Sequence, residues 1–360
     1  MGCVAGLLLV PTFLLSPLFG IAADRMNPRN GILVTIGLQA LLAGVAGAIA
    51  WRDALSMPML LGLALCFGAV SAAHTPIRLA LIPRLVDRAA LPSAIGYSAI
   101  IFNTSRIIGP AIGAAMLNIG SVASAFFLSS VICIAAQVML SRVDGSARPI
   151  ASAHRGSFAD QLRAGLRYVQ SESTIRIVFL LTLTSGLLGR TAIELLPAIS
   201  GRVLQGDAGT LAILTAGAGV GSICGGLIVS RQSSSLPKLR RLVMLGLCSC
   251  AVILMSVSLW QILALGVLAI GLVSLSTTMI GTGCQAITQL MVDEDYRGRV
   301  MSLWTVIAMG TPAVGAMLVG ALADRLSFGL ALAATATLAL FVVAWVFVYL
   351  RRVDSPLRPR

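Results

Sequence analysis

Long apolar segments separated by short polar breaks run through the whole chain. A helix needs about 20 mostly apolar residues to cross the hydrocarbon layer of a membrane. Segments of about that length or longer occupy residues 2–22, 31–51, 58–81, 94–118, 121–141, 175–199, 209–230, 239–258, 260–290, 299–322 and 328–350. They are rich in Leu, Ala and Gly and do not alternate polar with apolar residues as barrel strands do. The pattern predicts an all-α polytopic membrane protein with about eleven spans.

Composition agrees with this class. Of the 360 residues, 58% are hydrophobic and 11% are charged, whereas soluble domains have about 45–50% apolar and about 25% charged residues. Little polar chain remains for a soluble domain. This excludes cytosolic enzymes, secreted disulfide scaffolds and nucleic-acid-binding modules, although the net charge is +13. The seven cysteines lie in apolar segments without the spacing of a thiolate metal site, so we predict no metal and no cofactor.

Lys and Arg residues are concentrated in alternate loops. With eleven spans, 21 of the 26 lie on one side of the membrane and three on the other, and two lie within spans. By the positive-inside rule the basic side is cytoplasmic. We therefore expect a multi-pass protein of the cell inner membrane whose linker and C-terminus are cytoplasmic. The odd number of spans places the N-terminus outside, which suggests that one span preceding Met1 is missing.

The predicted spans form two sets joined by one long polar stretch. We expect an N-terminal half at 1–142 with five spans, a linker at 143–174, a C-terminal half at 175–350 with six spans, and a tail at 351–360. Identical residues lie 202 positions apart in the two halves: Gly96 and Gly298, Pro110 and Pro312, Ala111 and Ala313, Gly113 and Gly315, and Ala114 and Ala316. This repeat predicts two pseudo-symmetric six-helix halves, the first of which lacks its first helix here.

The second part of the linker has the pattern of an amphipathic helix. Its apolar residues share one helical face: Phe158, Leu162, Leu166 and Val169. Its polar residues lie elsewhere: Arg163, Arg167 and Gln170. The pattern fits a helix at the membrane interface and fits a solvated connector equally well.

A glycine, an acid and basic residues follow the first predicted span at a fixed spacing: Gly20, Asp24, Arg25 and Arg29. The glycine permits a neighbouring helix to approach, and a carboxylate at the cytoplasmic boundary can pair with an arginine or with a helix N-terminus. An ordinary interfacial turn uses the same residue types. The segment resembles motif A of the major facilitator superfamily, which implies a cytoplasmic gating latch in which Arg78 is the partner of Asp24. Asn27 and Pro28 depart from that motif.

The predicted span at 94–118 carries small residues and a proline at regular spacing: Gly96, Ser105, Gly109, Pro110, Gly113 and Ala114. Small residues let helices pack closely, and a proline frees one carbonyl and bends the helix. The spacing resembles motif C of the same superfamily, which implies an exporter or antiporter. Ser105 and Ala114 stand where that motif has glycine.

The chain is similar to the superfamily from its second helix to its twelfth. Three segments resemble the branch that contains the enterobactin exporter and the macrolide efflux proteins: 78–86, 106–110 and 297–302. In the second half, the counterpart of motif A at 226–231 has Ser230 in place of the acid. The resemblance therefore implies a degenerate second latch.

Charged residues within predicted spans are candidates for function because a charge in lipid is costly. Arg190 and Glu194 lie four positions apart on one helical face. A rise of about 1.5 Å per residue places Arg190 roughly 22 Å from the inner surface, in the outer third of the span. The two residues can form a buried site for protons and substrate, or only a structural pair. Arg106, near the middle of its span, is a candidate for binding an anionic group.

Together with the resemblance to this superfamily branch, these features imply a secondary transporter, a proton-coupled exporter of a siderophore or a hydrophobic drug-like molecule. No Gly-rich phosphate-binding sequence for ATP is present. The expected partners are the lipid bilayer, a small-molecule substrate and protons, without nucleic acid, and the protein is expected to be a monomer. Two alternatives stay open. A truncated, non-transporting remnant would lack the first helix, and an integral-membrane enzyme would need a cluster of acids, bases or metal ligands.

The predicted topology can be tested by thiol labelling. In a cysteine-free variant, cysteines introduced at Ser233 and Ser355 should resist a membrane-impermeant thiol reagent in intact cells, whereas one at Ser121 should react. The reason is the excess of basic residues in the loops that hold the first two positions. Labelling of the first two positions in intact cells would show that the orientation is reversed.

Overall fold

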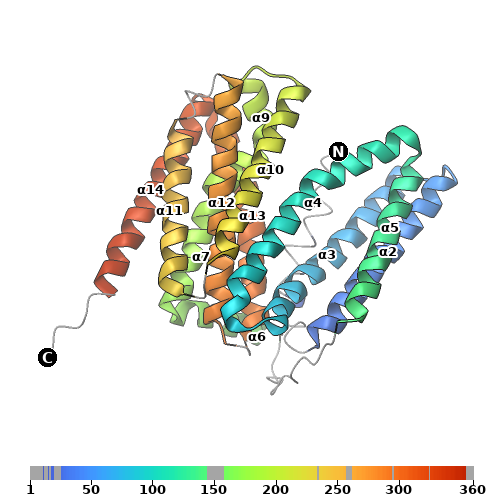
Figure 1. Cartoon of the computed structure of the whole chain (residues 1–360), viewed down its shortest axis with the longest axis horizontal. Coiled ribbons are helices and arrows are strands. Elements are labelled where there is room, and N and C mark those ends of the chain that lie inside the picture. The colour runs from blue at the N-terminus through green and yellow to red at the C-terminus, as the bar shows by residue number, and fades with distance from the viewer. Residues whose placement is uncertain are drawn as a thin grey trace. The chain divides into compact units, whose positions relative to one another are not determined.

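Helices make up the protein in a computed structural model of the chain (Figure 1). The structure describes residues 11, 15, 18, 19, 26–143, 158–232, 235–256, 262–293, 296–323 and 325–353. The long helices are α2 (Pro28–Trp51), α3 (Met57–Leu85), α4 (Leu91–Ile119), α5 (Val122–Ser141), α10 (Ala208–Ser230), α11 (Leu236–Met255), α12 (Leu263–Met291), α13 (Arg297–Ala323) and α14 (Phe328–Val353). The linker holds α6 (Phe158–Ser171), and a 3₁₀ turn, η1 (Arg88–Ala90), precedes α4.

The predicted class is confirmed. Within the described residues, eight helical segments are long and apolar enough to cross a membrane. No strand occurs in these parts of the chain. The predicted span at 2–22 lies almost wholly outside the described residues, so the total number of spans stays a prediction.

Polar residues at the loop ends determine where several helices begin. The Ser121 and Ser124 side chains form a reciprocal capping box at the start of α5. The Asp207 carboxylate caps α10 by accepting a hydrogen bond from the Thr210 backbone N–H at 2.9 Å. These short polar breaks therefore both end the apolar segments and start the next helices.

The span predicted at 175–199 is interrupted, which the apolar pattern did not indicate. It consists of α7 (Ser173–Ser185), a π-helical turn η2 (Gly186–Arg190), α8 (Thr191–Glu194), α9 (Leu196–Ala198) and a second π-helical turn η3 (Ile199–Val203). Leu195, two residues before Pro197, departs from the helical conformation. Pro197 has no backbone N–H and therefore cannot continue the helical hydrogen bonds. Hydropathy alone does not distinguish a π turn from an α turn.

The chain forms two compact units. The first comprises Met1–Asp87, Ile108–Glu172 and Met291–Val306, and the second comprises Arg88–Ile107, Ser173–Leu290 and Ile307–Arg360. Each unit takes segments from both predicted halves, because α4 and α13 each contribute to both units. The boundaries of the halves stay a prediction.

In the first unit, α2 packs against α3 and α5 (Figure 1). Ile32 of α2 belongs to an apolar cluster with α3. Two polar side chains of α5 donate hydrogen bonds to backbone carbonyls of α2: Ser130 Oγ to Ala40 O at 2.8 Å, and Gln137 Nε2 to Leu33 O at 3.2 Å. Such interhelical hydrogen bonds satisfy polar groups that lipid cannot.

In the second unit, α10 and α12 approach each other through glycines. Three of them lie at four-residue spacing on α10 and face α12: Gly217, Gly221 and Gly225. A Cβ atom on Gly221 would overlap the carbonyl oxygen of Gly271. Beside this contact, the Ser222 and Ser274 hydroxyls form a hydrogen bond of 2.6 Å. The close approach therefore requires glycine at these positions.

Replacing Gly221 with alanine should destabilise the protein. The added methyl group meets backbone, which must move, and overpacking of this kind costs about 1–3 kcal/mol. Gly62→Ala on α3 is the matched control, because no described atom lies within 4 Å of the added Cβ. We expect a lower midpoint of thermal unfolding in detergent for Gly221→Ala and an unchanged or higher one for Gly62→Ala. Equal midpoints for the two variants would contradict this packing argument.

Candidate functional site

The segment that resembles motif A leads directly into α2. The Asn27 side chain accepts a hydrogen bond from the Arg29 backbone N–H at 3.0 Å, and Pro28 occupies the first helical position. Asparagine followed by proline is a favourable helix start, which explains the departure from the motif. Gly20, Asp24 and Arg25 lie outside the described residues, as does the predicted contact of Asp24 with Arg78.

Arg29, the last basic residue of the segment, binds the end of another helix. Its Nη2 donates a hydrogen bond to the Ser141 carbonyl oxygen at 2.6 Å, in the last turn of α5. A cation at a helix C-terminus is favourable because the last carbonyls are unsatisfied and the helix dipole is negative there. Arg29 therefore joins the start of α2 to the end of α5, a role that the sequence did not indicate.

Arg78 lies one helical turn after the half-buried His74 on α3. The Thr35 hydroxyl donates to the Ile32 carbonyl at 3.0 Å and lies 3.0 Å from His74 Nδ1. This side-chain contact joins α2 to α3 beside Arg78.

The first turns of α4 pack closely against the last turns of α10. A Cβ atom on Gly96 would lie 2.6 Å from the Ser230 backbone nitrogen, and one on Gly226 would lie 2.6 Å from Ile100 Cγ1. The Ser93 hydroxyl donates a hydrogen bond to the Ser230 carbonyl oxygen. We call this set of five residues the α4–α10 contact. Ser230, which stands at the position of the motif A acid, therefore lies against the start of α4 without supplying a charge.

The other glycines of the segment that resembles motif C have no such neighbour. No described atom lies within 4 Å of a Cβ atom added to Gly109 or Gly113. Ser105 donates to the Ile101 carbonyl of its own helix at 2.7 Å. Three further motif or candidate residues lie in α4, but their side chains are outside the described part of the structure: Arg106, Pro110 and Ala114. Of the glycines in this segment, only Gly96 makes the close contact that was expected of all of them.

Arg190 and Glu194 lie beside the interruption of α7. Arg190 ends the π-helical turn η2 and is half-buried, whereas Glu194 ends α8 and is exposed. The sequence had suggested a buried acid. One helical turn separates the two residues, so both lie close to the π-helical turn η2. Turns of this kind occur frequently at functional sites.

The π turn is stabilised by α13. The Thr191 hydroxyl donates to the Gly186 carbonyl at 2.9 Å and lies 3.3 Å from the Pro312 carbonyl oxygen. A Cβ atom on Gly315 would collide with the Thr191 hydroxyl. Pro312 and Gly315 were noted in the sequence only as members of the repeat. Thr191, which they contact, was missed because a threonine in an apolar segment is not a signal by itself.

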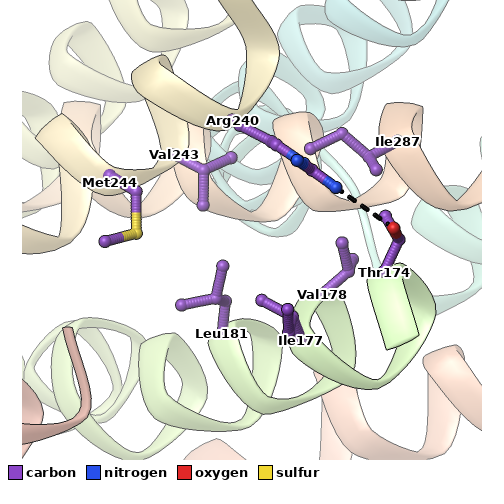
Figure 2. Close-up of a pocket in the computed structure, with 8 residues that line it drawn as sticks. All are labelled: Thr174, Ile177, Val178, Leu181, Arg240, Val243, Met244 and Ile287. Atoms are coloured by element: carbon purple, nitrogen blue, oxygen red, sulfur yellow. Dashed lines mark hydrogen bonds between the residues drawn. The ribbon is translucent and has the colours of Figure 1, made fainter. Parts of the chain in front are cut away.

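A small cleft lies between α7, α11 and α12 (Figure 2). Its volume is about 10 Å³, which is room for one water molecule. Aliphatic side chains line most of it: Ile177, Val178, Leu181, Val243, Met244 and Ile287. At one end, Arg240 Nη2 donates a hydrogen bond to Thr174 Oγ1 at 3.1 Å. The cleft is too small for a transported molecule.

Within the described residues, no three His, Cys, Asp or Glu side chains lie close enough together to hold a metal ion.

Comparison with known proteins identifies the family. Residues 3–359 match the family described as transmembrane secretion effector. The chain belongs to this family. A relative from Staphylococcus aureus (strain NCTC 8325 / PS 47), the staphyloferrin A transporter, is 23% identical over 329 residues, which cover 88% of this chain and 79% of the relative.

Several solved structures share the fold of this chain. The human organic anion transporter TETRAN has a TM-score of 0.78 at 15% identity, with 95% of this chain and 82% of that chain covered. The E. coli fucose:proton symporter has a TM-score of 0.73 at 14% identity, with 96% and 90% covered. A bacterial homologue of the iron transporter ferroportin, in an outward-facing state, has a TM-score of 0.71 at 15% identity, with 95% and 89% covered.

These findings confirm the predicted superfamily. The chain is a multi-pass membrane transporter with the major facilitator superfamily fold. At such low identities the solved structures show the fold alone. The roles predicted for individual residues, from the latch to Arg190 and Glu194, stay predictions.

The α4–α10 contact predicts a local effect of a single methyl group. Gly96→Ala should increase amide hydrogen exchange in the first turns of α4 about tenfold, since overpacking costs about 1–3 kcal/mol and the clash is with backbone. The matched control is Gly113→Ala in the same helix, which should leave that exchange unchanged. If both variants exchange like the unmodified protein, the contact does not hold the start of α4.

Proposed function

We propose that this protein exports a siderophore-like molecule with an anionic group, in exchange for protons. The observation that carries the proposal is the placement of Arg190 and Glu194 at the π turn of an intramembrane helix. Charges at such depth are costly and mark substrate or proton pathways in transporters. The name of the staphyloferrin A transporter among the relatives supports the substrate class.

Exchange follows if protonation of Glu194 opposes substrate binding at Arg190. Because Glu194 is exposed and a carboxylate facing lipid is unfavourable, we infer that it faces a water-filled cavity. Deprotonated, Glu194 holds the Arg190 guanidinium toward that cavity through some of its five N–H donors, and the remaining donors bind the substrate anion. Protonated, Glu194 no longer holds the guanidinium there, and the anion is released. Substrate binding therefore favours proton loss from Glu194, and Arg106 is a second candidate for the anionic group.

Alternating access would use the two ends of α4. The α4–α10 contact lies at the end of α4 that the basic loops place in the cytoplasm. We infer that this contact closes the cytoplasmic side. In the opposite state Gly109 and Gly113, which have no close neighbour in the described residues, would pack against another helix near the outer side.

The motif A latch would act beside this contact. Gly298 lies 202 positions after Gly96, and Asp24 corresponds to Ser230. By this pseudo-symmetry, we propose that Asp24 would reach the first turn of α13, where the positive helix end stabilises a carboxylate. Arg78 would be its second partner. We further propose that the protein is an inner-membrane monomer with a cytoplasmic linker and C-terminus, organised as the halves 1–142 and 175–350.

Proton coupling can be measured directly. Staphyloferrin A added to the purified protein in weakly buffered solution should release protons from the unmodified chain and release far fewer from Glu194→Gln, because the titrating carboxylate is gone. Glu172→Gln is the matched control, since Glu172 is exposed between α6 and α7, and it should behave like the unmodified protein.

Two outcomes would count against this assignment. Undiminished release from Glu194→Gln would remove Glu194 from the coupling mechanism. Transport that survives double charge exchange, Arg190→Glu with Glu194→Arg, better than either single change would show that the two residues only stabilise each other.

A further inference from the structure

The linker helix α6 is fixed to the start of α13 by an aromatic and polar contact. The Tyr168 hydroxyl donates a hydrogen bond to Asp293 Oδ2 at 3.2 Å and accepts one from the Asp293 backbone N–H at 3.2 Å. The rings of Tyr168 and Tyr296 stack with centroids 4.6 Å apart. Burial raises the pKa of Tyr168, so the phenol keeps the proton that it donates.

A glycine brings the two helices close together. A Cβ atom on Gly165 would lie 3.2 Å from Arg299 Cβ and 3.7 Å from Leu303 Cδ1. The Arg299 guanidinium in turn lies 5.2 Å from the centre of the Tyr296 ring. Gly165 and Tyr168 therefore form the docking face of α6.

This contact determines the depth of α6. The residues that it touches lie just before α13 or in its first two turns, and α13 is long and apolar enough to cross a membrane. Its first turns therefore lie at the boundary between lipid and water. Only Glu172 separates α6 from α7, the start of another such segment. Both connections keep α6 at the level of the lipid headgroups.

The remaining surface of α6 is divided into sectors around the helix axis. With 3.6 residues per turn, Val169 and Leu166 are rotated about 40° and 100° from Gly165, and Leu166 is 44% exposed. The exposed Arg163 and Arg167 follow at about 160° and 200°. Around the helix, the docking face is followed by the apolar face and then by the basic face. A helix that lies flat beside a membrane span needs this order, because its docking face meets protein, its apolar face meets lipid tails and its basic face meets lipid headgroups.

We propose that α6 lies on the anionic lipid of the cytoplasmic leaflet, with Leu166 and Val169 in the acyl boundary and Arg163 and Arg167 on lipid phosphates. Amphipathic helices bind membranes through such an apolar face together with electrostatic attraction to anionic lipids. The ion pair of Arg163 with Asp160 spans 3.9 Å between two largely exposed side chains. A pair of this kind is weak, so it does not withhold Arg163 from a phosphate.

The depth of α6 can be measured by spin labelling of the full chain. In a cysteine-free variant, a nitroxide is attached at Leu166→Cys or, as the matched control, at Gln170→Cys beside the arginines. The protein is reconstituted in phosphatidylcholine alone or mixed with phosphatidylglycerol. In the mixed bilayer the label at 166 should respond to oxygen and that at 170 to a water-soluble nickel chelate. A label at 166 that is accessible to nickel in both bilayers would overturn the proposal.

The arginines are tested by charge removal. The double variant Arg163→Gln with Arg167→Gln should bind the mixed bilayer more weakly. The population with the label at 166 immersed in lipid, relative to the population with that label in water, should fall about thirty-fold, because each basic residue near an anionic surface contributes about 1 kcal/mol. Arg163→Lys with Arg167→Lys keeps the charge and should retain the ratio, which separates electrostatic loss from misfolding. An unchanged ratio in the glutamine variant would overturn the role of anionic lipid.

Discussion

Lipid supplies no hydrophobic force between helices, because its tails are as apolar as leucine, so helices in this protein must associate through close backbone contact. Glycine permits that contact. Gly221 of α10 lies against Gly271 of α12, and Gly96 of α4 lies against Ser230 of α10. A single methyl group at Gly221 or Gly96 would occupy space that a neighbouring backbone already fills. The helices near the candidate site depend on this condition for their positions.

The same environment restricts where a helix can be interrupted. Non-α backbone at membrane depth needs protein or water beside it, because lipid cannot satisfy freed polar groups. The interruption that follows α7 packs against α13. The Thr191 hydroxyl donates a hydrogen bond to the Gly186 carbonyl oxygen and lies near the Pro312 carbonyl oxygen of α13. Gly315 leaves space for Thr191. A threonine and a glycine on different helices thus stabilise the turn that carries Arg190.

Two helices link the internal repeat to the tertiary structure. Gly96 in α4 and Gly298 in α13 are related by the repeat of 202 residues, and each of these helices contributes to both compact units. Their first turns make different contacts. Gly96 meets Ser230 of a transmembrane helix, whereas the first turns of α13 meet Gly165 of the linker helix. The two segments related by the repeat therefore have different partners.

The sequence alone determined the helical class, because transfer into lipid acts on each apolar segment independently of its neighbours. It also carried the family resemblance, because the motif residues are adjacent in the chain. Only the tertiary structure decided which small residues make contact. Gly96 packs tightly while Gly109 and Gly113 in the same motif do not, and Arg29 binds the Ser141 carbonyl 112 positions away. A sequence does not show which glycines contact a neighbouring helix, nor which group a given arginine binds. Close approach depends on the path of a second backbone, which no local pattern of residues specifies.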